Sequence, residues 1–180
     1  MSPPPSRRRF LALGGSAGTI ALSGCLDALS GNEQQVCSSG YRHVGEVFTK
    51  RSIVEYLRYA SLTVPQSITP GEQFVAALTN ESTDPLTTLG KTRYMIQRLS
   101  PDGTWQNTIG VPDEHEWSPS QRILEPSEEL RWEMELSASE FSGPFQRCTT
   151  HTPATYRFIY WGFSNHNAGI ALAAPFELVE

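Results

Sequence analysis

Short apolar runs alternate with turn residues along most of the chain after residue 45. In the clearest run, 130–136, apolar and polar residues alternate strictly, so one face carries Leu130, Trp132, Met134 and Leu136. Comparable runs occur at 53–64, 74–78, 93–99, from 105 onward, at 156–163 and at 170–179. No long segment places apolar residues three or four apart, as a helix requires. The pattern predicts an all-β chain, an antiparallel β-sandwich of about seven strands.

Turn residues separate these runs. Thr-Pro-Gly-Glu at 69–72, Pro-Asp-Gly at 101–103 and Glu-Pro-Ser at 125–127 are typical of tight turns. Pro175 has no N–H for a ladder hydrogen bond, which places the last run near a sheet edge. The first half of the run 53–64 also fits one turn of helix, so a helical alternative stays open there.

The segment 26–40 is small, polar and without periodicity, which is typical of a flexible spacer. No internal repeat is visible. A length of 180 residues suits one domain with a targeting segment and a tether. We therefore expect a tether at 25–45 and one sandwich domain at 46–180.

The N-terminus is basic and then apolar. Ser6 precedes three arginines and two large apolar residues, and this motif comprises Arg7, Arg8, Arg9, Phe10 and Leu11. The apolar stretch that follows has about 12 residues, whereas a membrane-spanning helix needs roughly 20. This order resembles the twin-arginine export signal, which implies export in the folded state. The alternative is an uncleaved membrane anchor or an unstructured basic N-terminus.

The signal ends in a segment that resembles a lipobox, made of Leu22, Ser23, Gly24 and Cys25. The resemblance implies a signal peptide at 1–24 and a lipid on Cys25 that anchors the protein to the membrane. The expected location is the cell surface, on the outer face of the cytoplasmic membrane. Met-Ser-Pro-Pro-Pro before the arginines makes the signal similar to those of haloarchaeal lipoproteins.

The net charge limits the kinds of partner that the protein can bind. The whole chain carries 14 basic and 19 acidic residues, a formal net charge of −5. Loss of residues 1–24 removes three arginines and no acid, which leaves a net charge of −8. Such an acidic surface repels nucleic acid and anionic lipid headgroups, so we expect no nucleic-acid partner.

A longer motif order extends through residues 70–180. A strand ending at Asn80 is followed by Tyr-x-Ile-x-Arg-Leu at 94–99, Asp-Gly-x-Trp at 102–105 and Leu-x-Pro-Ser-Glu-Glu at 124–129. Pro-x-x-Tyr-Arg-Phe at 153–158 comes next. This order resembles the bacterial immunoglobulin-like domains of small secreted lipoproteins. The chain departs from them at Ser127, where a glycine is usual, and at 153–157, where a Pro-Gly-x-Tyr-Arg turn is usual.

Three aromatic residues are expected in the core of this immunoglobulin-like sandwich: Tyr156, Trp132 and Trp161. Tyr156 opens a late strand, from which its hydroxyl can return to nearby backbone, as a corner tyrosine does. Trp161 also borders the polar loop that runs to Asn167.

Cysteines are the clearest candidates for covalent chemistry. With Cys25 lipidated, Cys37 and Cys148 remain in an oxidising compartment, and we expect a disulfide between them. Closing a loop of about 110 residues contributes on the order of 4–5 kcal/mol in the chain-entropy model. The alternative is a metal, because Cys148-Thr-Thr-His151 resembles a fragment of blue-copper sites. No methionine follows His151, so we expect no metal and no cofactor.

Other chemistry is weakly supported. The sequence has no nucleophile elbow, phosphate loop, zinc-protease motif or calcium loop. The polar cluster 113–117, which contains His115, fits a solvated loop better than a cation site or an acid–base pair. Asn80-Glu81-Ser82 is a candidate glycosylation sequon at Asn80.

These features favour a non-catalytic surface lipoprotein that binds an unidentified protein or small-molecule partner. Loops near His115 and His166 are the candidate contact face, because binding residues concentrate on loops. The alternatives are a metal-binding or electron-transfer lipoprotein using Cys148 and His151, and a protease-inhibitor-like sandwich.

Overall fold

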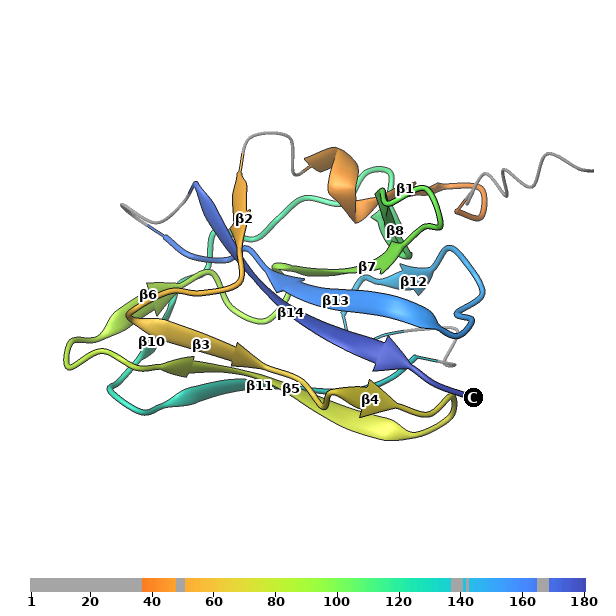
Figure 1. Ribbon diagram of the computed structural model, residues 1–180. Helices are drawn as coiled ribbons and strands as arrows, with labels where there is room; N and C mark the ends of the chain where they lie inside the picture. Colours follow the sequence, from red (N-terminus) through yellow and green to blue (C-terminus); the bar gives the residue numbers. More distant parts are fainter. Residues whose placement is uncertain (1–36, 48–50, 137–140, 142, 165–168) are drawn as a thin grey trace, which may run out of the picture. The chain divides into compact units, whose positions relative to one another are not determined.

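The computed structural model describes residues 37–47, 51–136, 141, 143–164 and 169–180 (Figure 1). All of them belong to one compact unit, Gln34–Glu180. The predicted signal peptide, the lipobox with Cys25 and the loop residue His166 lie outside the described residues. None of the described helices is long and apolar enough to cross a membrane.

The described residues are almost entirely strand and turn, so the predicted all-β class is confirmed. The one helical element among them is a 3-10 turn, η1 (Val44–Val47). The strands in chain order are β1 (Tyr41–His43), β2 (Ser52–Val54), β3 (Ala60–Thr63), β4 (Ser67–Ile68), β5 (Gln73–Asn80), β6 (Leu86–Thr88), β7 (Tyr94–Leu99), β8 (Trp105–Asn107), β9 (Ile109–Pro112), β10 (Arg122–Leu124), β11 (Glu129–Glu135), β12 (Gln146–Arg147), β13 (Ala154–Tyr160) and β14 (Ile170–Leu178).

The largest sheet has six strands. Its order is β2-β14-β13-β7-β8, and β4 also pairs with β14. Neighbouring strands are antiparallel except that β2 and β4 run parallel to β14. The segment 53–64, for which a helical turn stayed open, overlaps the end of β2 and contains β3.

A second sheet faces the first. It has the order β11-β5-β3, all antiparallel, and a two-stranded pair of β10 and β6 accompanies it. The burial of β11 alternates residue by residue, as predicted, with Leu130, Trp132 and Met134 buried. Figure 1 shows the two sheets as two layers, β13, β14 and β7 in one and β3, β5 and β11 in the other.

Aromatic side chains from both sheets fill the space between them. The rings of Trp132 and Phe158 lie 5.1 Å apart, and those of Phe74 and Phe176 lie 6.0 Å apart. Each pair joins one residue from the sheet of β5 and β11 to one from the sheet of β13 and β14. This aromatic core accounts for much of the area that the fold removes from water.

A third, small sheet arises where one strand changes partners. Thr108 separates β8 from β9 and is fully buried, and its N and Oγ1 both donate to the Ile96 carbonyl at 3.0 Å. Beyond this residue the chain leaves the six-stranded sheet, and β9 pairs with β1 and β12.

The folded unit includes part of the predicted tether. The sequence predicts a spacer over 25–45, but Tyr41 pairs with Pro112 in β1 and β9, and Cys37 is buried. Backbone pairing needs no apolar pattern, so this short polar strand leaves no periodic signal. Within the described residues, the fold therefore begins at Cys37.

Candidate functional site

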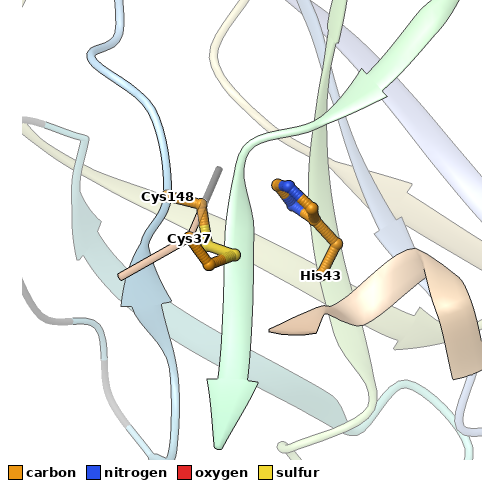
Figure 2. Close-up of side chains that lie close together, drawn as sticks. All are labelled: Cys37, His43 and Cys148. Atoms are coloured by element: carbon orange, nitrogen blue, oxygen red, sulfur yellow. A yellow bond between two sulfur atoms is a disulfide. The ribbon is translucent and has the colours of Figure 1, made fainter. Parts of the chain in front are cut away.

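The expected disulfide is present. The sulfur atoms of Cys37 and Cys148 are bonded, and the two residues are 111 positions apart (Figure 2). Cys37 precedes β1, whereas Cys148 directly follows β12, so the bond spans the two outer strands of the small sheet. Each of these strands also pairs with β9 between them.

A glycine makes room for this bond. A Cβ on Gly110 in β9 would lie 2.6 Å from the Cys148 sulfur and 2.7 Å from the Cys37 sulfur. The sulfurs therefore occupy the place of the missing side chain. Nothing in the sequence marks Gly110, because the register that brings it beneath the sulfurs joins distant segments.

One imidazole approaches the sulfurs, and it belongs to His43. The two sulfurs and a ring nitrogen of His43 all lie within 4.8 Å of one another (Figure 2). His43 is the register partner of Gly110, and directly opposed residues of a sheet project to the same face. The sequence gives no sign of this proximity.

His151 lies elsewhere, although it is close to Cys148 in sequence. Its Nδ1 makes a 2.7 Å hydrogen bond with the Leu136 carbonyl, so this nitrogen carries the proton. The pKa of His151 is lowered to about 4, mainly by burial and to a smaller extent by the charges of Arg147 and Arg98, while the hydrogen bond to Leu136 opposes this shift. The Cys148 sulfur is bonded to Cys37 and offers no thiolate, so the described state does not fit the predicted copper alternative.

A second cluster lies at one end of the six-stranded sheet. The guanidinium carbon of Arg93 is 4.9 Å from the Trp117 ring centre and 5.0 Å from the Trp161 ring centre. The two indoles contact each other edge to face at 4.8 Å. Two more side chains contact these rings. The guanidinium carbon of Arg51 lies 4.8 Å from the Trp161 ring centre, and the ring centres of His115 and Trp117 are 4.5 Å apart. We call these five residues the cation–aromatic stack.

Strand ends position this stack. Arg51 precedes β2, Arg93 precedes β7 and Trp161 follows β13. The register brings these three strand ends to the same end of the sheet. Tyr160 of β13 opposes Tyr94 of β7 and Leu172 of β14. Leu172 in turn opposes Val54 of β2. The backbone N–H of Trp161 also donates to the Arg93 carbonyl at 2.9 Å.

Burial and like charge shape the electrostatics of the stack. Burial and then the charge of Arg51 lower the pKa of Arg93, which is 9% exposed. One Arg93 nitrogen donates to the Ser118 carbonyl at 2.8 Å, which ties the loop 113–118 to the sheet. Burial, and then the charges of Arg93 and Arg42, lower the pKa of His115. The imidazole of His115 is therefore largely uncharged at neutral pH.

The loop 113–118 offers little for acid–base catalysis. The His115 Nε2 atom is buried and has no hydrogen-bond partner in the described part of the chain. Its carboxylate neighbours Asp113, Glu114 and Glu116 are exposed to solvent. An acid–base pair would need one of these carboxylates bonded to the ring. The arrangement instead places three exposed carboxylates over a largely buried aromatic base.

Asn80, the predicted glycosylation residue, is fully buried. Its Nδ2 donates to the carbonyls of Asp84 and Leu124, both at 2.9 Å, and its Oδ1 accepts from the Ser82 N–H and hydroxyl. A glycan on Nδ2 would have to break these bonds and enter the core. In the folded protein, Asn80 therefore holds two turns together and is closed to modification.

The three aromatic residues expected in the core are all buried. The Tyr156 hydroxyl donates to the Thr152 carbonyl at 2.8 Å and accepts from the Thr152 N–H at 3.1 Å. This is the return to upstream backbone that defines a corner tyrosine. Trp132 donates to the Lys91 carbonyl at 2.8 Å, and Trp161 is 1% exposed within the stack.

An open depression of about 600 Å³ lies beside β11. Exposed charged residues dominate its rim, and Arg131 there is already paired with Glu129 at 2.7 Å. Its lining comprises Lys91, Thr92, Arg131, Trp132, Glu133 and Gly143. No convergent set of polar groups marks it as a ligand site among the described residues.

Comparison with known proteins assigns no family. No family model and no curated protein matches the chain. Among solved structures, the alkylpurine DNA glycosylase AlkC of Pseudomonas fluorescens shares 15% identity at a TM-score of 0.35, covering 69% of this chain and 32% of that one. The β-glucosidase of Listeria innocua shares 12% identity at a TM-score of 0.34, covering 67% of this chain and 16% of that one.

The sulfur carrier protein SoxY of Chlorobium limicola shares 9% identity at a TM-score of 0.31, covering 75% of this chain and 89% of that one. This chain spans about a third of the matched glycosylase and about a sixth of the matched glucosidase. Likenesses at these TM-scores carry no argument about the function of this chain.

Proposed function

We propose that this protein is an exported lipoprotein whose β domain binds a partner at the cell surface and performs no catalysis. The N-terminal sequence supports export, since a twin-arginine motif at 7–11 precedes a lipobox ending at Cys25. The disulfide between Cys37 and Cys148 is consistent with an oxidising compartment.

The two facing sheets are proposed to be an immunoglobulin-like sandwich. Two features support this assignment: the antiparallel sheet β11-β5-β3 packs on β13 and β14, and Tyr156 bonds the backbone of Thr152 as a corner tyrosine. Two features are additions to such a sandwich: the chain changes sheets at Thr108, and β2 and β4 run parallel to β14.

One observation carries the binding proposal. The cation–aromatic stack joins the loop 113–118, where the sequence predicted a contact face near His115, to Trp161 at the end of β13. A loop whose aromatic base is fixed by packing is preorganised for binding, so less ordering entropy is lost on association. The exposed carboxylates of Asp113, Glu114 and Glu116 then favour a partner with a basic surface.

Crosslinking in intact membranes tests this proposal. The double variant Glu114→Lys/Glu116→Lys reverses two exposed charges without entering the core. The matched control, Glu125→Lys/Glu133→Lys, makes the same change at exposed positions outside this loop. We expect one reproducible crosslinked partner with the wild type and the control, and its loss with the loop variant. Equal crosslinking of all three proteins, or no partner at all, would contradict the proposed face.

The intact mass of membrane-purified protein tests the anchor separately. We expect loss of residues 1–24, a lipid on Cys25, and alkylation of Cys37 and Cys148 only after reduction. A full-length mass without lipid would disprove the anchor and leave the binding proposal to be judged by crosslinking. No observation in the described residues favours the protease-inhibitor alternative.

A further inference from the structure

We propose that reduction of the Cys37–Cys148 disulfide opens a site for a thiophilic divalent cation such as Zn²⁺. The ligands are the two cysteine thiolates and the imidazole of His43. This inference does not depend on the proposed binding function, because it concerns the small sheet β1-β9-β12 and not the cation–aromatic stack.

The donor atoms are already close to the required distances. The two sulfurs and a His43 nitrogen lie within 4.8 Å of one another. Zinc–sulfur bonds of about 2.3 Å and zinc–nitrogen bonds of about 2.0–2.1 Å place tetrahedral donors roughly 3.5–3.8 Å apart. Once the disulfide is cut, the sulfurs must separate and the imidazole must approach them by about 1 Å. Side-chain rotation supplies movements of this size.

Gly110 provides the space for this rearrangement. A Cβ at this position would lie within 2.7 Å of both sulfurs, so any other residue would fill the place where the three donors converge. His43 is paired with Gly110 in the register of β1 and β9 and projects to the same face. An ion held there would rest against bare backbone.

Backbone pairing keeps the donors together after reduction. His43 belongs to β1, which pairs with β9 along its whole length. Cys148 donates its backbone N–H to the Thr108 carbonyl at 2.9 Å, next to the pairing of β12 with β9. Cys37 is followed by a turn in which the Tyr41 N–H donates to the Ser38 carbonyl at 3.1 Å. None of these bonds requires the disulfide.

A thiol or a phosphine can reduce the Cys37–Cys148 disulfide to the two thiols that the site requires. Two molecules of a thiol supply two electrons and two protons, the sulfur–sulfur bond breaks, and the reductant leaves as its own disulfide. A phosphine does the same and becomes a phosphine oxide with oxygen from water. A divalent ion then displaces the two thiol protons and accepts a lone pair from a ring nitrogen of His43. The ion and two thiolates sum to zero charge, which suits a partly buried position.

Binding of Co²⁺, a spectroscopic substitute for Zn²⁺, tests the proposal on the full-length chain. All proteins carry Cys25→Ser, so that Cys37 and Cys148 are the remaining cysteines, and a phosphine serves as reductant because thiols compete for metal. We expect one Co²⁺ per chain with sulfur-to-cobalt charge-transfer absorption after reduction, and none before it. His43→Gln removes a direct ligand and should weaken binding by about 100-fold or more, since loss of an outer-shell partner already costs about 10–100-fold. His115→Gln, the same change at a histidine outside the small sheet, should leave binding unchanged.

Three results would overturn the proposal. The first is a reduced protein without the charge-transfer band, and the second is equal affinity in the wild type and in His43→Gln. The third concerns folding and uses near-ultraviolet circular dichroism with and without Zn²⁺. If reduction abolishes the native signal, Zn²⁺ should restore it in the wild type and not in His43→Gln. A signal that Zn²⁺ does not restore counts against the site.

Discussion

Ser127 is a non-glycine residue with a left-handed backbone, at φ 65°. It follows Pro126 in a turn closed by the Glu128 N–H on the Glu125 carbonyl at 2.9 Å. Proline at the second position of such a turn and a positive φ at the third are features of a type II turn, which favours glycine at the third position. A glycine would adopt this backbone conformation freely, whereas Ser127 is strained in it.

Ser127→Gly should stabilise the protein. Relief of the left-handed strain gains about 1–2 kcal/mol, and the greater freedom of glycine in the unfolded chain costs about 0.5–1 kcal/mol. We expect a net rise of about 0.5–1 kcal/mol in the free energy of unfolding, measured in urea. Ser120→Gly, in an exposed loop without a positive φ, is the control and should not stabilise. A loss of stability in Ser127→Gly would contradict the strain.

His151 makes stability depend on pH. Its pKa is about 4 in the folded protein against 6.5 when unperturbed, so the unfolded chain binds more protons between these values. Stability from this residue is fully present above pH 6.5 and falls as the pH drops toward 4, by about 3 kcal/mol at most.

His151→Gln should flatten this profile. Glutamine keeps an N–H that can donate to the Leu136 carbonyl but does not titrate. Urea unfolding at a series of pH values from 4 to 7 measures the slope. The variant should lose the part of the slope that lies between pH 4 and 6.5, and a slope equal to the wild type would show that His151 does not cause it.

At the scale of elements, β9 determines how the small sheet is built. It carries Gly110 beneath the disulfide and pairs with β1 on one side and β12 on the other. Its two neighbours are short and half-buried, and no apolar alternation marks them. The stability of this sheet therefore depends on backbone pairing, on the disulfide and on the close approach that Gly110 permits.

Gly110→Ala tests this dependence. The added methyl group would meet both sulfurs and the Arg42 carbonyl, at 2.6–2.7 Å. We expect a loss of about 1–3 kcal/mol in the free energy of unfolding and faster reduction of the disulfide by a thiol. Gly169→Ala is the control, since nothing lies within 4 Å of its added Cβ. Equal stability and equal reduction rates in the two variants would disprove the steric role.

The sequence predicts elements well where an apolar face is buried. The alternation in β11 is required because a shift of one residue would turn Trp132 and Met134 toward solvent. The strands β1 and β12 escape prediction for the opposite reason, since their pairing is set by backbone groups. The partner change at Thr108 also lacks a signal, because its buried hydroxyl bonds a carbonyl twelve residues upstream.

At the scale of the whole folded unit, the sequence predicts the all-β class but not which strands pair. The turn residues and the short runs predict two β layers, but periodicity carries no information about which strands pair. The last strand, β14, lies between β13 and the early strands β2 and β4. The candidate sites show the same division. The cysteine count predicts the disulfide, whereas the approach of His43 and the contact of Trp117 with Trp161 depend on long-range register.

The disulfide also decides which part of the chain can be stretched. For a chain held at Cys25, as proposed, a mechanical load enters the described residues at Cys37 and crosses directly to Cys148. The 111 residues of separation, a contour length of roughly 370–400 Å, are out of the load path until the bond is cut. A pull toward the C-terminus is resisted by β13 and β14 through their pairing with each other and with β7, β2 and β4, so we expect the extension of the tethered protein under tension to depend on its redox state.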